Sequence, residues 1–270
     1  MNINTTCDNS QERTLTICNI KRLAMVAIAA VACLSATTSA AIINYGNLNG
    51  TDVMYIGVEE DTRDETNALF GTPSITGNFL DFDPLSFSSN SSSSTGTNNS
   101  DIVDGQLNFT VMSNDNTFDI TNVIITESGD YTTVGLGNAQ ATASVAAPVI
   151  FTVTHVGGSP LSAPVAGSGN LVFTPNGGVY NIADGAGFWD GTLDVDIRSA
   201  LDAAGIGGAA TKIEFVLDNT LTTSAVDGGS AFIAKKDFNV NTIGEVVPEP
   251  GSFCLLGLGS LMLLGTRRKK

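Results

Sequence analysis

Apolar and polar residues alternate along several short runs of the chain, which restricts its fold more than any other feature. In one run, Leu193, Val195 and Ile197 fall on one face of an extended strand, and Asp194 and Asp196 fall on the other. A period of two is typical of a half-buried β-strand. The runs that we predict as strands are also rich in β-branched and aromatic residues; they are 102–112, 118–126, 148–156, 187–197 and 211–217.

Turn-forming residues separate these runs. Glycine, asparagine, aspartate and proline gather at 128–130, 175–178 and 227–229, and these residues provide the backbone angles that tight turns require. Short strands with regular breaks predict an all-β fold, an antiparallel β-sandwich of the jelly-roll-like kind. Good helix formers at 198–204, followed by Gly205, predict one short connecting helix.

A low-complexity segment precedes the first of these runs. Residues 88–100 are almost entirely serine, asparagine and threonine, and they have little apolar surface to offset the entropy lost on ordering. We predict a long mobile Ser/Asn loop within one domain. A linker between two domains is the lesser alternative.

The N-terminus has the order of a secretory signal peptide. Lys21 and Arg22 precede an apolar run at 23–34 and small residues at 35–41, and the run is too short to span a membrane as a helix. We expect a leader over 1–40, cut after Ala40 or, as second choice, after Ala41. Its partners would be a Sec-type exporter and a signal peptidase. The alternative is a buried apolar helix of a cytosolic protein.

The charge and cysteine content of the remaining domain, 41–246, exclude several functions. From 41 to 247 there are 24 Asp and Glu against 5 Lys and Arg, a formal charge of −19. Such a surface repels nucleic acid. The four cysteines, at 7, 18, 33 and 254, all lie outside this domain, so we expect no disulfide, thiol nucleophile or zinc–cysteine site within it.

The composition changes abruptly at 247–270. Pro248, Glu249 and Pro250 precede an apolar run at 251–266, and the chain then finishes with four cations, Arg267, Arg268, Lys269 and Lys270. Sixteen helical residues span about 24 Å, so flanking residues must help to cross a core of about 30 Å. We predict a transmembrane helix outside the fold, with the basic stop in the cytoplasm and the domain exported.

This tail resembles the PEP-CTERM sorting signal in all three of its parts. The resemblance implies that an exosortase, a membrane protease or transpeptidase of bacteria that make exopolysaccharide, recognises Pro248, Glu249 and Pro250 and removes the helix. A permanent single-span anchor is the alternative. The exported domain also resembles an uncharacterised group found with this tail, in stretches such as 101–107 and 126–131; this second resemblance implies no function.

Residues with catalytic chemistry are sparse in the domain. His155 stands alone in an apolar run, and neither a Gly-x-Ser-x-Gly nor a His-Glu-x-x-His motif occurs. Asp81 with Asp83, and Asp190 with Asp194 and Asp196, could bind calcium or perform glycoside chemistry, but a solvated acidic face is favoured. We assign no catalytic, cofactor-binding or metal residue.

Three functions therefore stay open. The favoured one is a non-enzymatic envelope or extracellular-matrix protein associated with exopolysaccharide or biofilm. The second is a carbohydrate-binding module, in which Trp189 beside Phe188 would stack on a sugar ring, although core or edge packing is the favoured role for Trp189. The third is a secreted glycoside hydrolase that uses the paired Asp residues.

Overall fold

A computed structural model describes residues 41–63 and 65–247 of the chain. The secondary structure is almost entirely strand. The strands and helices are β1 (Ile42–Asn49), β2 (Val53–Asp61), β3 (Ser74–Thr76), β4 (Phe79–Phe82), β5 (Ser88–Ser92), β6 (Asn98–Ser113), β7 (Phe118–Val134), β8 (Gln140–Ala146), β9 (Pro148–Val156), β10 (Ser159–Asn170), β11 (Val172–Thr174), the 3-10 turn η1 (Asn176–Gly178), β12 (Val179–Asn181), β13 (Ala186–Asp196), α2 (Ile197–Ala203), β14 (Ala210–Val226) and β15 (Ser230–Val246).

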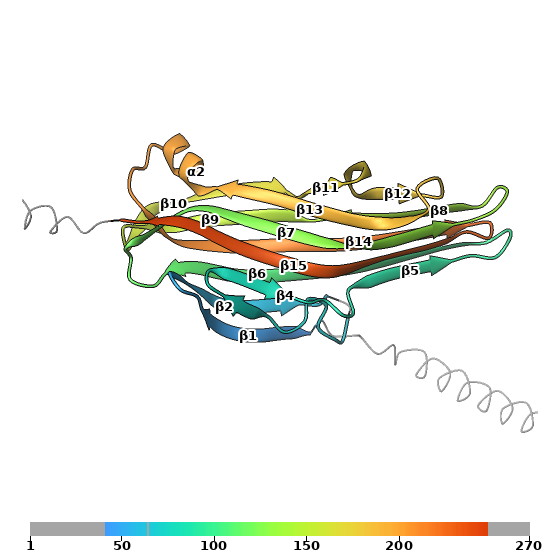
Figure 1. Cartoon of the computed structure of the whole chain (residues 1–270), viewed down its shortest axis with the longest axis horizontal. Coiled ribbons are helices and arrows are strands. Elements are labelled where there is room, and N and C mark those ends of the chain that lie inside the picture. Colours follow the sequence, from blue (N-terminus) through green and yellow to red (C-terminus); the bar gives the residue numbers. More distant parts are fainter. Residues whose placement is uncertain (1–40, 64, 248–270) are drawn as a thin grey trace, which may run out of the picture. The chain divides into compact units, whose positions relative to one another are not determined.

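The strands form two antiparallel sheets, which confirms the predicted β-sandwich. The first sheet has the order β1-β2-β6-β14-β8-β12, with β9 also paired to β14 and β10 paired to β9. The second has the order β11-β13-β7-β15-β4-β3, with β5 also paired to β15. Consecutive strands repeatedly change sheet from β10 to β15, as expected of a jelly-roll-like chain (Figure 1).

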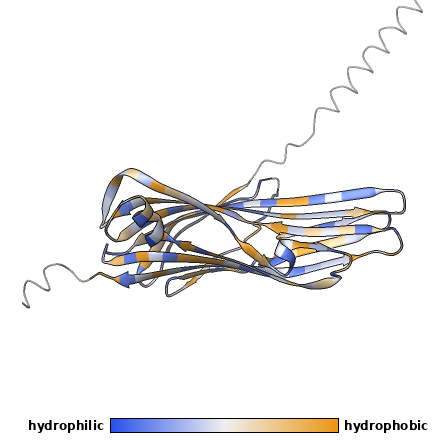
Figure 2. Ribbon diagram, turned by 90° about the horizontal axis from the view of Figure 1, so that it is seen from above, coloured by the Kyte–Doolittle hydropathy of each residue, from blue (hydrophilic) through white to orange (hydrophobic). Residues whose placement is uncertain are grey.

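The core lies between the inner faces of the two sheets. Buried inward residues alternate with half-buried ones along the long strands, and Figure 2 shows the matching change of hydropathy along the ribbons. The two longest neighbouring pairs are β14 with β6 and β15 with β7, which are paired over almost their whole lengths. Strands β14 and β15 thus form the centre of the two layers, one in each sheet.

The short connecting helix is present as α2. Its N-cap is Asp196, whose carboxylate accepts a hydrogen bond from the Ser199 N–H at 2.8 Å and thereby satisfies one free donor of the first turn. Arg198 on this helix forms an ion pair with Asp119 of β7 and donates to the Gly208 carbonyl oxygen at 2.7 Å. These contacts hold α2 at the end of the sandwich.

The predicted mobile Ser/Asn loop at 88–100 is wrong for most of its length, because only 93–97 form a loop between two strands. Residues 88–92 form β5, which pairs with β15, and β6 begins at Asn98. Backbone pairing satisfies the polar main chain, and Ser89 and Ser91 are small enough to be buried between the sheets. The Ser89 hydroxyl also lies 2.9 Å from the Thr223 hydroxyl oxygen. Low apolar content therefore does not prevent order here, because the neighbouring strands provide the partners.

The predicted break at 128–130 is also wrong, because β7 continues through it to Val134. Gly129 pairs with Trp189 on one side and Lys235 on the other. A Cβ atom at position 129 would lie 2.6 Å from Trp189 Cε2. This glycine is required by close packing within a strand, not by a turn.

Candidate functional site

The residues predicted for sorting lie at the two ends of the chain. Ala40, the motif Pro248, Glu249 and Pro250, and the basic stop Arg267 to Lys270 are outside the described residues. The second predicted cleavage residue, Ala41, is described: its carbonyl oxygen accepts hydrogen bonds from the Thr62 N–H at 3.1 Å and from the Thr62 hydroxyl. At the other end, β15 runs to Val246, so a central strand leads into the sorting segment.

A membrane-spanning helix was predicted at 251–266, which is outside the described residues. Over 41–63 and 65–247, the helices are all too short or too polar to cross a bilayer.

The two acidic groups on the surface are far apart. Asp81 on β4 lies three strands from Thr192, the residue between Asp190 and Asp194 on β13. Strands lie about 4.8 Å apart, which puts these backbones about 14 Å apart. A glycosidase pair requires about 5–10 Å between its carboxyl groups, so the sheet does not bring Asp81 and the β13 carboxylates together as such a pair.

The individual carboxylates have structural partners. Asp194 accepts a hydrogen bond from the Asn122 side chain at 2.8 Å, and Asp196 caps α2. Burial, together with nearby Asp83 and Asp237, raises the pKa of Asp81. Within the described part of the chain, no three His, Cys, Asp or Glu side chains converge as a metal-binding group.

The aromatic pair on β13 is divided between the core and the solvent. Trp189 is fully buried, edge-on to Phe173 with ring centroids 5.8 Å apart, whereas the Phe188 ring is 81% exposed. Trp189 therefore packs in the core and offers no face to a sugar. His155 is half-buried on β9, with its Nδ1 atom 3.1 Å from the Thr154 hydroxyl oxygen.

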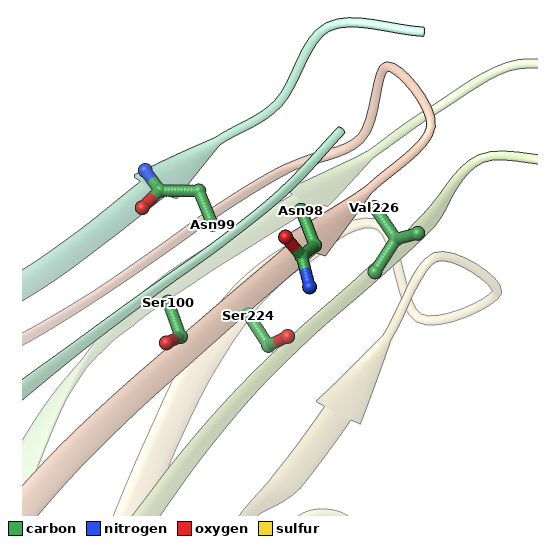
Figure 3. Close-up of a pocket in the computed structure, with 5 residues that line it drawn as sticks. All are labelled: Asn98, Asn99, Ser100, Ser224 and Val226. Carbon is green, nitrogen blue, oxygen red and sulfur yellow. The ribbon is translucent and has the colours of Figure 1, made fainter. Parts of the chain in front are cut away.

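A surface hollow of about 320 Å³ lies beside paired strands β6 and β14. Figure 3 shows Asn98 and Ser100 next to Val226 and Ser224, with the Asn99 side chain directed away from Val226. Its lining offers amides and hydroxyls but no charged or aromatic group. Such a hollow has no group that could act as an acid, a base or a stacking platform.

The most unusual chemical group lies in the core between the sheets. Lys235 of β15 and Glu127 of β7 are 1% and 2% exposed, and Lys235 Nζ forms an ion pair with Glu127 Oε2. The same oxygen accepts a hydrogen bond at 2.6 Å from the Nδ2 amide of Asn219, which is fully buried on β14. One carboxylate oxygen thus binds an amine from its own sheet and an amide from the opposite sheet.

Aromatic rings surround the amine of this core triad (Lys235, Glu127 and Asn219). Lys235 Nζ lies 4.8 Å from the ring centroid of Phe70 and 5.0 Å from those of Phe87 and Phe238. Burial lowers the pKa of Lys235, although Glu127 opposes this shift. The cation–π contacts partly replace the lost hydration, and the rings keep water away from the amine.

A second buried carboxylate helps to fix one of the aromatic rings around Lys235. Glu60 of β2 is fully buried, accepts backbone N–H donors from Leu69 and Phe70, and accepts the Tyr45 hydroxyl at 2.7 Å. Through its hydrogen bond from the Phe70 N–H, Glu60 helps to position the Phe70 ring against Lys235. Its charge also opposes the lowering of the Lys235 pKa.

Each member of the core triad lies opposite a glycine on the neighbouring strand. Asn219 pairs with Gly105, Lys235 with Gly129, and Glu127 with Gly191. A Cβ at Gly191 would be 3.2 Å from Glu127 Cγ, and a Cβ at Gly105 would be 2.8 Å from Leu69 Cδ1. Gly191 thus leaves space for the Glu127 side chain, and Gly105 leaves space for Leu69 and Phe87, which pack near the triad.

The core triad was not predicted from the sequence, although the sequence carries a signal for it. Alternation places Ile125, Leu217 and Ile233 in the core. It therefore also places in the core the residues two positions later, which are Glu127, Asn219 and Lys235. Three polar residues at inward positions of three strands indicate a buried polar group. Their convergence on one atom needs the strand registers, which the sequence does not provide.

Comparison with known families finds one match. The family described as the PEP-CTERM protein-sorting motif matches residues 246–269, which includes Pro248, Glu249 and Pro250. No curated protein matches the chain.

Proposed function

We propose that this PEP-CTERM protein is a cell-envelope or extracellular-matrix protein without enzymatic activity on external substrates, and that it acts in association with exopolysaccharide. The sorting motif at 246–269 carries this proposal, because it indicates a secreted, membrane-anchored or extracellular protein processed by an exosortase. A Sec-type exporter and signal peptidase would handle the leader.

The geometry of the domain supports a non-enzymatic role over a glycoside hydrolase. Asp81 and the β13 carboxylates are three strands apart, and Asp194 and Asp196 are engaged by Asn122 and α2. A carbohydrate-binding module is the weaker alternative. Its expected platform, Trp189, is buried, and Phe188 is the exposed ring of that pair.

The sorting proposal is tested on the full chain in the source organism. Changing Pro248, Glu249 and Pro250 together to alanine should leave export intact, because the leader and the apolar run are unchanged. It should block exosortase recognition, so uncut protein accumulates in the inner membrane. Replacing the four cations 267–270 by neutral residues should instead weaken retention or orientation.

The C-terminus of the mature protein decides between processing and permanent anchoring. Mass spectrometry of the wild-type protein should find chains that end before the apolar run. If Lys270 is still attached in most molecules, the processing proposal is wrong and the tail is a permanent anchor. A matched control is Glu245→Ala, next to the matched segment but outside it, which should be processed normally.

A further inference from the structure

The core triad combines an amine, a carboxamide and a carboxylate at one point. Lys235 Nζ and Asn219 Nδ2 both lie within hydrogen-bond reach of Glu127 Oε2. The two nitrogen groups come from opposite sheets and therefore meet across the sandwich. We infer that Lys235 Nζ forms an intramolecular isopeptide bond with Asn219 Cγ, with Glu127 as the acid–base group. This inference does not depend on the proposed sorting or on exopolysaccharide.

The bond can form without an external reagent. Lys235 first transfers a proton from its ammonium group to Glu127, and the neutral amine attacks Asn219 Cγ. Protonated Glu127 then gives its proton to Nδ2, the Cγ–Nδ2 bond breaks, and ammonia leaves. The new amide nitrogen returns its extra proton to Glu127. The products are one amide bond, one ammonia molecule and neutral Glu127, so atoms and charge balance.

The environment favours attack by the Lys235 amine. An amine must be neutral to attack, and desolvation in an apolar pocket is a known way to make a lysine nucleophilic. Lys235 has such a pocket, formed by Phe70, Phe87 and Phe238. Fixed positions on the central strands of the two sheets also remove much of the entropic cost of bringing the two groups together.

Two buried oxygens fit the reacted state better than the unreacted one. Among the described residues, neither Glu127 Oε1 nor Asn219 Oδ1 has a hydrogen-bond partner, and leaving such atoms unpaired in a core is costly. After the reaction, neutral Glu127 carries an O–H donor, and the amide oxygen at position 219 is an acceptor. The reaction thus provides a donor for an acceptor that otherwise lacks one.

The bond would connect the two layers of the domain. Asn219 is on β14 and Lys235 is on β15, the central strands of the first and second sheets. The domain from 41 to 246 contains no cysteine, so disulfides cannot perform this function. The link would attach β15 covalently to the opposite sheet. Since β15 leads into the sorting segment, the strand next to that segment would be the one that is cross-linked.

Digestion of the denatured full chain with a protease that cuts before aspartate tests this inference directly. Cuts before Asp218, Asp227 and Asp237 separate Asn219 from Lys235. The bond predicts that the peptides Asp218–Val226 and Asp227–Lys236 stay joined, with a combined mass lower by one ammonia. Two separate peptides of unmodified mass in the wild type would overturn the inference. Loss of ammonia from Asp218–Val226 alone, or a link to Glu127 with loss of water, would also overturn it.

Variants test the role of each group. Glu127→Gln keeps the size of the side chain but cannot accept the proton, and Asn219→Ala removes the acceptor carbon; both should yield separate peptides. Lys236→Met changes the adjacent, exposed lysine and should leave the peptides joined. Joined peptides in Glu127→Gln would show that Glu127 is not the acid–base group. If a variant does not fold, the wild-type digest still decides whether the bond exists.

Discussion

Gly129 lies on β7, between the neighbouring strands β13 and β15 of the second sheet and next to the Trp189 ring. It pairs with Trp189 on β13 and with Lys235 on β15, and a Cβ there would be 2.6 Å from two Trp189 ring carbons and would clash with the Ala234 carbonyl oxygen. Neither neighbour can move easily, because one is a buried ring and the other is backbone. At this position, the absence of a side chain allows the Trp189 ring and the backbone of β15 to pack directly against β7.

Gly129→Ala should therefore destabilise the domain strongly. Overpacking of a dense core typically costs about 1–3 kcal/mol and sometimes more, and we expect a loss of about 3 kcal/mol in the free energy of unfolding, measured by urea denaturation. The matched control is Gly207→Ala, because a Cβ at 207 meets nothing within 4 Å. Equal stability of the two variants would contradict the described packing around Trp189.

At the scale of elements, the sequence predicts the strands, turns and helix whose structure follows from the pattern of their own residues. The alternation of apolar residues predicts the body of β7, β9, β13 and β14, and the Gly-rich segment 227–229 correctly predicts the turn between β14 and β15. The run of helix-forming residues at 198–204 overlaps α2. These signals are local, so a single segment is sufficient to read them.

Elements that depend on distant partners were not predicted. The β5 strand has serine and asparagine at every position, and its order comes from pairing with β15. Gly129 resembles a turn residue until the position of Trp189 is known. The core triad belongs to the same class, because the positions of Glu127, Asn219 and Lys235 in the core follow from alternation but their contacts follow from sheet register.

The order of β5 can be tested with two neighbouring substitutions. Ser89 is buried and Asn90 is exposed, so a lysine at 89 must enter the core whereas a lysine at 90 points to solvent. We expect hydrogen exchange in 88–92 to be slow in the wild type and in Asn90→Lys, and at least about tenfold faster in Ser89→Lys because local opening becomes easier. Fast exchange of 88–92 in the wild type would instead support a mobile loop.

At the scale of the whole molecule, the domain combines a cysteine-free sandwich with an acidic surface and a C-terminal strand that leads into the sorting motif. Its most polar buried group connects the two sheets through β14 and β15. An ion pair in this position would not be expected to add much stability, because apolar replacement of a buried ion pair is often neutral or stabilising. A covalent bond would add stability by restricting the unfolded chain.

Apolar replacement of the whole core triad distinguishes these two cases. The triple variant Lys235→Met, Glu127→Leu and Asn219→Leu removes the buried charges together, so no charged partner is left alone. If the isopeptide bond forms, the wild type has a closed loop between 219 and 235, and a cross-link across about 15 residues contributes about 3 kcal/mol in the chain-entropy model. Urea unfolding of the full chain in detergent should then show the triple variant less stable than the wild type by about that amount. Glu127→Gln alone should lose the cross-link and also be less stable. A triple variant as stable as the wild type, or more stable, would show that the triad contributes no more than a buried ion pair does.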